Sequence, residues 1–289
     1  MKDVVTRFAP SPTGRLHLGH AFSALLTHRF ARERGGMFLL RIEDIDPGRA
    51  RIQHRDAIMV DLTWLGLTFD GEILYQSERL ELYAEALERL RAQGLVYPCF
   101  CTRAAIAAEV AASASAPHGP DGPLYPGTCR GLSEKERASR VRSEPHAWRL
   151  DAAKASAIAG TLCWQDHGIE VRAEPEAFGD VVLSRKDAPV SYHLAVTVDD
   201  AAQGVSDVVR GRDLYAATHV HRLLQQLLDL PVPHYHHHPL LAGPDGRRLA
   251  KRHGAPTLTG LREAGADPEQ LAADLLAGRL PAGYSAAGA

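Results

Sequence analysis

The chain has 289 residues, with 33 basic and 35 acidic side chains and a formal net charge of −2. This balance excludes a protein that holds nucleic acid by overall charge alone, although a local basic face stays compatible with it. No apolar run reaches the roughly 18 residues that a membrane span needs, and residues 1–7 lack the apolar stretch of a signal peptide. We therefore expect a cytoplasmic protein with no membrane partner.

The first third of the chain alternates between strand and helix patterns. An apolar-leaning run at residues 4–8 precedes a breaker-rich loop at 9–14, and a helical pattern starts near Leu18 and stops at Gly35-Gly36. Residues 37–42 have the composition of a buried strand, and the periodicity predicts helices at 52–65 and 78–93. This order predicts an α/β fold whose parallel sheet is joined by crossover helices.

The amino-acid composition changes after residue 97. Residues 98–144 contain cysteines, an Ala/Ser-rich stretch and a Pro/Gly-rich run, which is typical of an insertion without a core of its own. Strands are then predicted at 147–150, 169–172, 180–184, 192–198 and 205–210, and a helix at 216–229. Residues 257–289 predict one or two short helices and a frayed Ala/Gly-rich tail.

The loop after the first predicted strand carries two histidines at the start of a helix. His17 and His20 share one face of the first turn and can donate to phosphate oxygens, while Gly19 permits a close approach by a ring or sugar. Free amides at a helix N-terminus attract anions, and ligands bind at the carboxyl ends of strands in such sheets. By itself this segment favours a proline-rich loop bearing two surface histidines over a nucleotide site.

The wider sequence resembles the class I aminoacyl-tRNA synthetases. Residues 7–20 resemble the HIGH signature, and the run Arg-Phe-Ala-Pro-Ser-Pro-Thr-Gly at 7–14 resembles its glutamyl/glutaminyl branch. The run Arg-Leu-Ala-Lys-Arg at 248–252 resembles a degenerate KMSKS loop that lacks the usual serines. The resemblance implies that His17, Gly19, His20 and Lys251 bind ATP, which arrives with Mg²⁺, and that His17, His20 and Lys251 are catalytic.

A glutamate pocket needs about two cations for the carboxylates and one anion for the ammonium group. Arg7 and Arg210 end two predicted strands, and Glu43 ends another. Arginine suits carboxylates because its planar fork bonds both oxygens. The runs at 41–46, 191–200 and 209–214 resemble later blocks of the glutamyl branch, and this resemblance implies that six residues contact the amino acid: Arg7, Ala9, Ser11, Glu43, Tyr192 and Arg210.

Three of the four cysteines fall within residues 99–129. Three thiolates and one more donor would complete a tetrahedral Zn²⁺ site that staples the insertion, although spacing alone also allows three unrelated reduced cysteines. A truncated relative of the glutamyl synthetases carries a Cys, Cys, Tyr, Cys set, and the match implies one structural zinc on Cys99, Cys101, Tyr125 and Cys129. The histidines at 234 and 236–238 are compatible with adventitious metal binding, but they favour a strand beside the KMSKS-like loop.

The resemblance covers residues 4 to about 254 and implies four parts. Residues 1–97 form the first half of a Rossmann-type catalytic domain, 98–145 the zinc-binding insertion, and 146–256 the second half with the KMSKS-like loop. Residues 257–289 form a short helical C-terminal segment, too short for the roughly 100 residues of an anticodon-binding domain.

This truncated form is similar to the glutamyl-queuosine tRNA(Asp) synthetases, which implies an ATP-dependent ligase. Such an enzyme would activate L-glutamate without tRNA and pass it to the queuosine base in the anticodon of tRNA(Asp); a monomer is expected. Two alternatives remain: a truncated glutamyl-tRNA synthetase that charges a 3′ end, and a catalytically dead paralogue that binds RNA or nucleotide.

Overall fold

The structure is a computed structural model of the chain, and it describes residues 3–112, 118–120, 122–243, 249, 256–281 and 283–287. The α-helices are α1 (Leu18–Arg32), α2 (Ile52–Trp64), α3 (Leu80–Ala92), α4 (Arg103–Ala112), α5 (Glu134–Ser143), α6 (Ala152–Ala159), α7 (Tyr192–Ala202), α8 (Ala217–Leu227), α9 (Leu258–Glu263) and α10 (Pro268–Leu276). The 3₁₀ helices are η1 (Gln76–Glu78), η2 (Pro175–Phe178) and η3 (Arg212–Leu214). None of the helices in the described part is long and apolar enough to cross a membrane.

The strands of the described residues form one four-stranded, two three-stranded and two two-stranded sheets. The strands are β1 (Val5–Phe8), β2 (Met37–Ile42), β3 (Leu74–Tyr75), β4 (Val96–Cys99), β5 (His118–Gly119), β6 (Gly122–Pro123), β7 (Ala147–Leu150), β8 (Cys163–Asp166), β9 (Ile169–Arg172), β10 (Val182–Ser184), β11 (Asp207–Gly211), β12 (His234–His238), β13 (Leu240–Ala242) and β14 (Ser285–Ala287). β1, β2 and β3 are parallel neighbours, and β11 pairs in parallel with β12.

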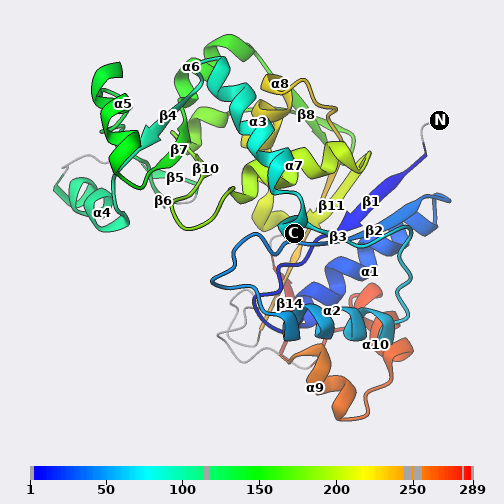
Figure 1. The fold of residues 1–289 in the computed structure, drawn as a ribbon. Coiled ribbons are helices and arrows are strands. Elements are labelled where there is room, and N and C mark those ends of the chain that lie inside the picture. The colour runs from blue at the N-terminus through cyan, green and yellow to red at the C-terminus, as the bar shows by residue number, and fades with distance from the viewer. Residues whose placement is uncertain are drawn as a thin grey trace.

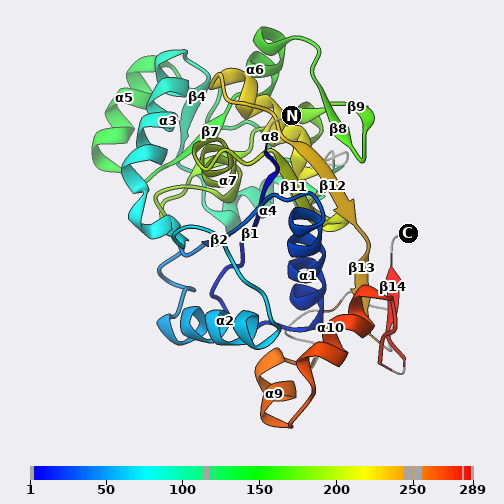
Figure 2. The ribbon, with the colours of Figure 1, turned by 90° about the vertical axis from the view of Figure 1, so that its right-hand side faces the viewer.

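The two groups of parallel strands meet at β1 and β11. The backbone N–H of Ser206, just before β11, donates to the carbonyl of Val5 in β1 at 2.9 Å. Helix α1 packs against β1, β2 and β11, so it crosses the junction, as Figure 2 shows. Strand β1 therefore has β2 as its neighbour on one side and the start of β11 on the other. Ligands bind at the carboxyl ends of the strands where such an order reverses.

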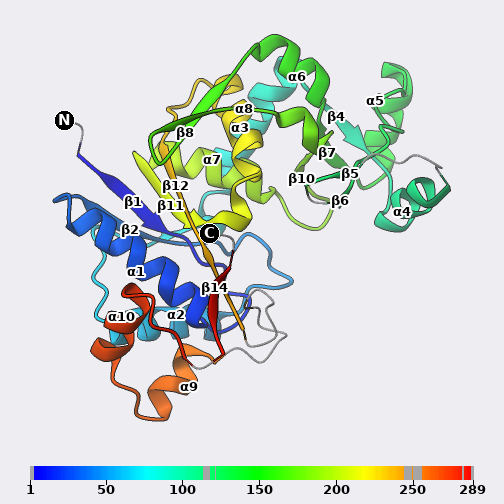
Figure 3. The same ribbon diagram turned by 180° about the vertical axis from the view of Figure 1, so that it is seen from behind.

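Two hydrophobic cores lie on either side of this junction. One gathers α1 and α2 with the C-terminal helices, and its α1 face is Leu18, Ala21 and Leu25, at helical spacing. The other gathers α3, α6, α7 and α8. Figure 1 shows the first group below the sheet, the second above it, and α4 and α5 projecting to one side. Figure 3 shows the same arrangement from behind.

Most predicted elements of the regular α/β part are confirmed, with boundaries that coincide or differ by at most three residues. The histidine strand is β12, and the predicted helices near 18, 52, 78 and 216 are α1, α2, α3 and α8. The predicted strand at 192–198 is wrong, because these residues form α7. Ser191 caps α7 by accepting from the N–H of Leu194, and the helix is buried on most sides, so its sequence lacks an amphipathic period.

The C-terminal tail also differs from the expectation of a frayed end. Residues 285–287 form β14, which pairs antiparallel with β13. The insertion is likewise better packed than its composition suggested, because Tyr97, Phe100 and Ala147 form a small core with two of the cysteines. Local composition does not show such long-range pairing.

Gly36 sets how closely β1 approaches the start of β2. A Cβ added there would lie 2.4 Å from the carbonyl oxygen of Val4 and 2.7 Å from its Cβ. The neighbouring N–H of Met37 donates to the same carbonyl at 2.7 Å, so the two backbones cannot separate without losing this bond. A side chain at position 36 would strain the edge of the sheet that carries Arg7.

We expect Gly36→Ala to lower the free energy of unfolding by about 1–3 kcal/mol, the usual cost of overpacking. Gly131→Ala is the matched control, because no atom of the described residues lies within 4 Å of its added Cβ. That control should change stability by less than about 0.5 kcal/mol. Urea denaturation followed by circular dichroism measures both, and equal midpoints would contradict the close approach.

Candidate active site

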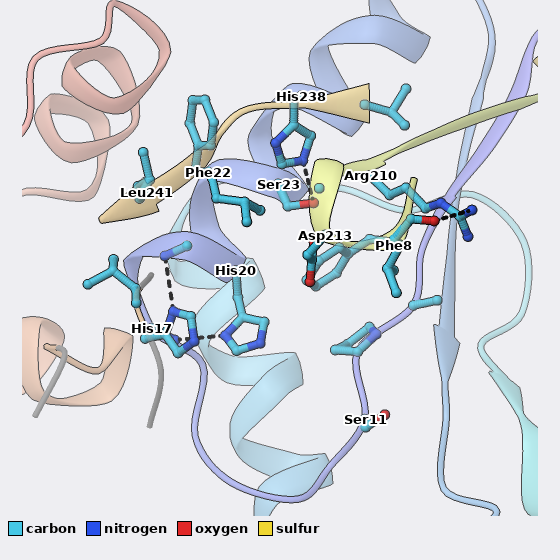
Figure 4. Close-up of a pocket in the computed structure, with 18 of the residues that line it drawn as sticks. Phe8, Ser11, His17, His20, Phe22, Ser23, Arg210, Asp213, His238 and Leu241 are labelled. Carbon is cyan, nitrogen blue, oxygen red and sulfur yellow. Dashed lines mark hydrogen bonds between the residues drawn. The ribbon is translucent and has the colours of Figure 1, made fainter. Parts of the chain in front are cut away.

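A cavity of about 420 Å³ opens at the carboxyl ends of β1 and β11 and the N-terminus of α1. Figure 4 shows His17 and His20 on one side of it, Arg210 on the opposite side, and Ser11 on the loop between them. The lining includes every described residue that the sequence assigned to ATP or glutamate, namely Arg7, Ala9, Ser11, His17, Gly19, His20, Glu43, Tyr192 and Arg210. The fold therefore brings together residues that are about 200 positions apart in the chain.

His17 and His20 cap α1 reciprocally. The Nδ1 atom of His17 accepts the N–H of Gly19 at 3.1 Å, and the Nδ1 atom of His20 accepts the N–H of His17 at 3.2 Å. In a neutral ring, an accepting Nδ1 places the proton on Nε2, so Nε2 is the donor. A Cβ at Gly19 would lie 3.0 Å from the ring of His17, which explains the glycine. The cap thus orients two ring donors at a positive helix end.

Arg7 is held on one edge by a carboxylate. Its Nε and Nη2 atoms donate to the two oxygens of Asp200 in α7, at 2.9 and 3.3 Å. Arg41, which is fully buried, donates to the same carboxylate at 2.8 Å and to Gln203 at 2.9 Å. Burial alone would raise the pKa of Asp200, but Arg7 and Arg41 hold it below the usual value. Asp200 is therefore a charged clamp for both arginines.

Glu43 lies beside this clamp, with a side chain that is 9% exposed and 3.6 Å from Nη2 of Arg41. Burial raises the pKa of Glu43 to about 7, against the opposing attraction of Arg41 and Arg7. The Nη2 and Nε atoms of Arg41 make no hydrogen bond in the described structure. The carboxyl of Glu43 therefore changes charge near neutral pH, and a cation in the cavity would stabilise its ionised form.

Arg210 has a different environment. Its Nε and Nη2 atoms donate to His237 Nε2 at 3.2 Å and to Thr218 Oγ1 at 2.7 Å, while Nη2 also reaches the carbonyl of Leu214 at 3.1 Å. Nη1 makes only long contacts, with Tyr192 Oη at 3.4 Å and His221 Nδ1 at 3.5 Å. Among the described residues no carboxylate pairs with this buried guanidinium. The positive charge of Arg210, at the cavity wall, is therefore not neutralised by any described carboxylate.

Lys251 lies outside the described residues, as does all of the KMSKS-like run except Leu249. Leu249 donates its N–H to the carbonyl of Leu241 at 2.9 Å and lines the cavity. Leu249 and β13 therefore both lie at the cavity wall. On its far side, Leu258 donates to the carbonyl of Leu16, next to His17.

The four residues predicted to bind metal converge at a second place. The Sγ atoms of Cys99, Cys101 and Cys129 all lie within 4.8 Å of one another. The Oη atom of Tyr125 lies 3.5 Å from the Sγ atoms of Cys99 and Cys101, and Cys101 Sγ lies 3.5 Å from Cys129 Sγ. The edge of a tetrahedron with Zn–S bonds of about 2.3 Å is roughly 3.8 Å, so this spacing suits a tetrahedral ion.

Several residues that shape the site were not identified from the sequence. Asp200 accepts from Arg7, Arg41 lies 3.6 Å from Glu43, and His237 accepts from Arg210. Asp200 and Arg41 fall inside blocks used for the resemblance, but their partners come from other elements. No local pattern marks such residues; pairing between β11 and β12 alone places His237 beside Arg210.

The family model described as "tRNA synthetases class I (E and Q), catalytic domain" matches residues 3–280. The chain belongs to this family of class I synthetases. It is 51% identical to the glutamyl-Q tRNA(Asp) synthetase of Rhodobacter capsulatus over 93% of this chain and 98% of that relative. It is 47% identical to the enzyme of the same name from Symbiobacterium thermophilum, over 93% of this chain and 84% of that one.

Solved structures of the family share the fold. Glutamate-tRNA synthetase from Elizabethkingia anophelis superposes with a TM-score of 0.80 at 27% identity, covering 95% of this chain and 61% of that one. A glutamate tRNA ligase from Elizabethkingia meningosepticum in complex with its amino acid gives 0.79 at 28% identity and is covered over 60%. The chain thus spans about three fifths of these structures. The predicted fold class and the assignment to the synthetase ligases are confirmed.

Proposed function

We propose that this class I synthetase activates L-glutamate with ATP and transfers the glutamyl group to the queuosine base in the anticodon of tRNA(Asp). The relatives named glutamyl-Q tRNA(Asp) synthetase support the acceptor. The observation that carries the amino-acid assignment is Arg210, a buried cation that no carboxylate of the described residues neutralises. An anionic side chain in the substrate supplies the missing charge.

The charges of the cavity match those of free glutamate. Arg210 binds the γ-carboxylate through Nη1, the atom with only long protein contacts, while Tyr192 closes the pocket beside it. Glu43 receives the ammonium group, and Arg7 orients the α-carboxylate from its clamped position. Ala9 and Ser11 line the loop that runs from this pocket toward the histidines. Glutamine would leave Arg210 buried without a counter-charge, at a cost of about 2–5 kcal/mol by analogy with broken buried pairs.

The first reaction needs positioning more than covalent chemistry by the protein. An oxygen of the glutamate α-carboxylate attacks the α-phosphorus of ATP in line, the bond to the β-phosphate oxygen breaks, and pyrophosphate leaves. His17, His20 and Gly19 receive the nucleotide at the helix N-terminus, where the ring donors and the positive end of the helix dipole stabilise phosphate charge. Lys251 stabilises the developing charge on pyrophosphate, and Mg²⁺ arrives with ATP.

In the second reaction a hydroxyl of the queuosine cyclopentenediol attacks the glutamyl carbonyl. The carbon–oxygen bond to AMP breaks, AMP leaves, and the hydroxyl proton is released as the ester forms. This acceptor is a base in a loop, so the enzyme takes a flipped-out or unstacked nucleotide rather than a 3′ end.

The cysteine cluster holds one structural Zn²⁺ through Cys99, Cys101, Tyr125 and Cys129. The spacing of the sulfurs suits tetrahedral coordination, and a closed set of four protein ligands is typical of structural zinc. The ion would join β4 to the segment around Cys129 and so stabilise the insertion. Arg130, next to that ligand, donates to Asp180 at 3.0 Å, which ties the cluster to the catalytic part.

The pKa of Glu43, about 7, predicts how glutamate binding depends on pH. Only the ionised carboxyl pairs with the substrate ammonium, so KM for glutamate should rise as pH falls through 7, approaching about tenfold per pH unit below it. The ammonium and carboxylates of free glutamate do not titrate in this range. ATP–pyrophosphate exchange between pH 6 and 8.5 measures how KM for glutamate depends on pH. Glu43→Gln should give a high, pH-independent KM, and a flat wild-type profile would contradict the assignment.

Metal analysis tests the zinc site. Protein purified without chelator should contain about one zinc per chain, and Cys101→Ser should lower the zinc content and the melting temperature together. Cys163→Ser is the matched control, since this cysteine lies in β8 outside the cluster. Loss of zinc in both variants, or well under one zinc in the wild type, would remove the proposal.

The acceptor is tested with labelled glutamate, ATP and total tRNA prepared with and without queuosine. Label that requires queuosine supports transfer to the modified base. Equal labelling of both preparations would instead favour a synthetase that charges a 3′ end. No label on either, together with no glutamate-dependent pyrophosphate exchange, would favour an inactive RNA- or nucleotide-binding paralogue.

A further inference from the structure

Arg210 is fixed from behind by neutral hydrogen-bond acceptors. A guanidinium can only donate, so His237 Nε2 and His221 Nδ1 must both be unprotonated acceptors where they meet Arg210. The Nε–Nη2 edge is anchored on His237 and Thr218, whereas the contacts of Nη1 with Tyr192 and His221 are longer, at 3.4 and 3.5 Å. Arg210 and Tyr192 both line the cavity, so one edge of the guanidinium is fixed by the protein at the cavity wall.

A second hydrogen bond sets the tautomer of His237. Its Nδ1 atom lies 2.9 Å from Oδ1 of Asp166, and its backbone N–H donates to the same oxygen at 3.1 Å. A carboxylate accepts, so Nδ1 carries the proton and Nε2 is left as the acceptor that Arg210 needs. The side chain of His237 is 0% exposed, whereas that of Asp166 is 17% exposed at the end of β8. Asp166, His237 and Arg210 thus form one chain of hydrogen bonds.

We propose that His237, oriented by Asp166, is a positioning residue that presents Arg210 to the substrate carboxylate. This inference rests on the proposed function, because it assumes that Arg210 binds glutamate. A neutral imidazole holds the guanidinium without cancelling its charge, unlike the carboxylate of Asp200 on Arg7. Asp166 orients the imidazole of His237 and does not itself contact the guanidinium of Arg210.

The environment of His237 keeps it neutral. Burial first, and the nearby charge of Arg210 second, lower the pKa of His237 to about 3, although Asp166 opposes the shift. Its ring stacks in parallel with Tyr235 and meets Trp164 and Tyr215 edge-on. With Nδ1 held by Asp166, the Nε2 atom lies 3.2 Å from Nε of Arg210 and 3.3 Å from Oγ1 of Thr218.

The neighbouring residue provides a matched control. His236 lies on the same strand, also meets a carboxylate (Asp207 Oδ1, at 2.8 Å), and lines a different cavity on the α1 side of the sheet. Successive residues of a strand face opposite sides, so His236 has no contact with Arg210. Replacing it perturbs a histidine–carboxylate pair of the same strand without touching the proposed glutamate pocket.

The test compares His237→Leu, His237→Gln and His236→Leu by ATP–pyrophosphate exchange. His237→Leu should raise KM for glutamate by about 10- to 100-fold, as expected for losing a hydrogen bond to a charged group, and leave KM for ATP within about twofold. The glutamine variant, which keeps an acceptor oxygen near the place of Nε2, should recover part of this loss. His236→Leu should leave both constants unchanged. A merely structural role would instead change both KM values and kcat together.

Asp166→Ala gives an independent measurement if His237→Leu does not fold. Freed from Asp166, His237 can place its proton on Nε2 and lose the bond to Arg210, so KM for glutamate should rise by about three- to tenfold. The double variant should show no further increase over His237→Leu, since both act through one contact. Unchanged KM for glutamate in His237→Leu or Asp166→Ala, with wild-type exchange intact, would overturn this inference alone. No glutamate-dependent exchange in the wild type would overturn the proposed function and this inference together.

Discussion

A buried guanidinium with only neutral protein partners is the constraint on which the site depends. A cation removed from water needs a compensating charge, and Arg210 finds none among the described carboxylates. Arg7, across the same cavity, is already paired with Asp200. Both arginines are anchored through Nε and Nη2. They differ in counter-charge: a carboxylate neutralises Arg7, whereas no described carboxylate neutralises Arg210.

Helix α7 supplies the carboxylates that make this asymmetry possible. Asp200 pairs with arginines from β1 and β2, while the adjacent Asp199 accepts from Gln76, Arg79 and Tyr83 around η1 and the start of α3. Asp199 is fully buried, so its hydrogen bonds tie α7 to the helices above the sheet. The two neighbouring acids thus face different sides, and α7 becomes the element that joins the pocket to the second core.

The sequence anticipated the parts of the site that lie in short contiguous motifs. The strand–loop–helix of residues 5–32 carries Arg7, His17 and His20 in an order dictated by local breakers and caps, and the strand at 37–42 is observed at those bounds. The helix at 192–202 was mistaken for a strand because Val196, Thr197 and Val198 favour strands and burial on most sides hides the helical period.

Contacts between distant segments could not be anticipated in the same way. The support of Arg210 comes from β12 and α8, and the orientation of His237 comes from the end of β8, about 70 residues away in the chain. The histidine run at 236–238 could be assigned to a strand, but only the register of β11 against β12 decides which ring meets Arg210. A shift by one residue would have placed His236 or His238 there instead.

Hydrogen bonds between distant segments also connect the insertion to the cavity. Asp180, buried before β10, accepts from Tyr97 at β4, from the N–H of Ala152 and from Arg130 beside Cys129. Lys186, on the loop that leads into α7, donates to the carbonyl of Phe100 between two of the cysteines at 2.7 Å. The chain from β10 to Tyr192 therefore has one end against the cysteine cluster and the other at Arg210. A metal that fixes the cysteines also fixes the start of the segment that delivers Tyr192 to the pocket.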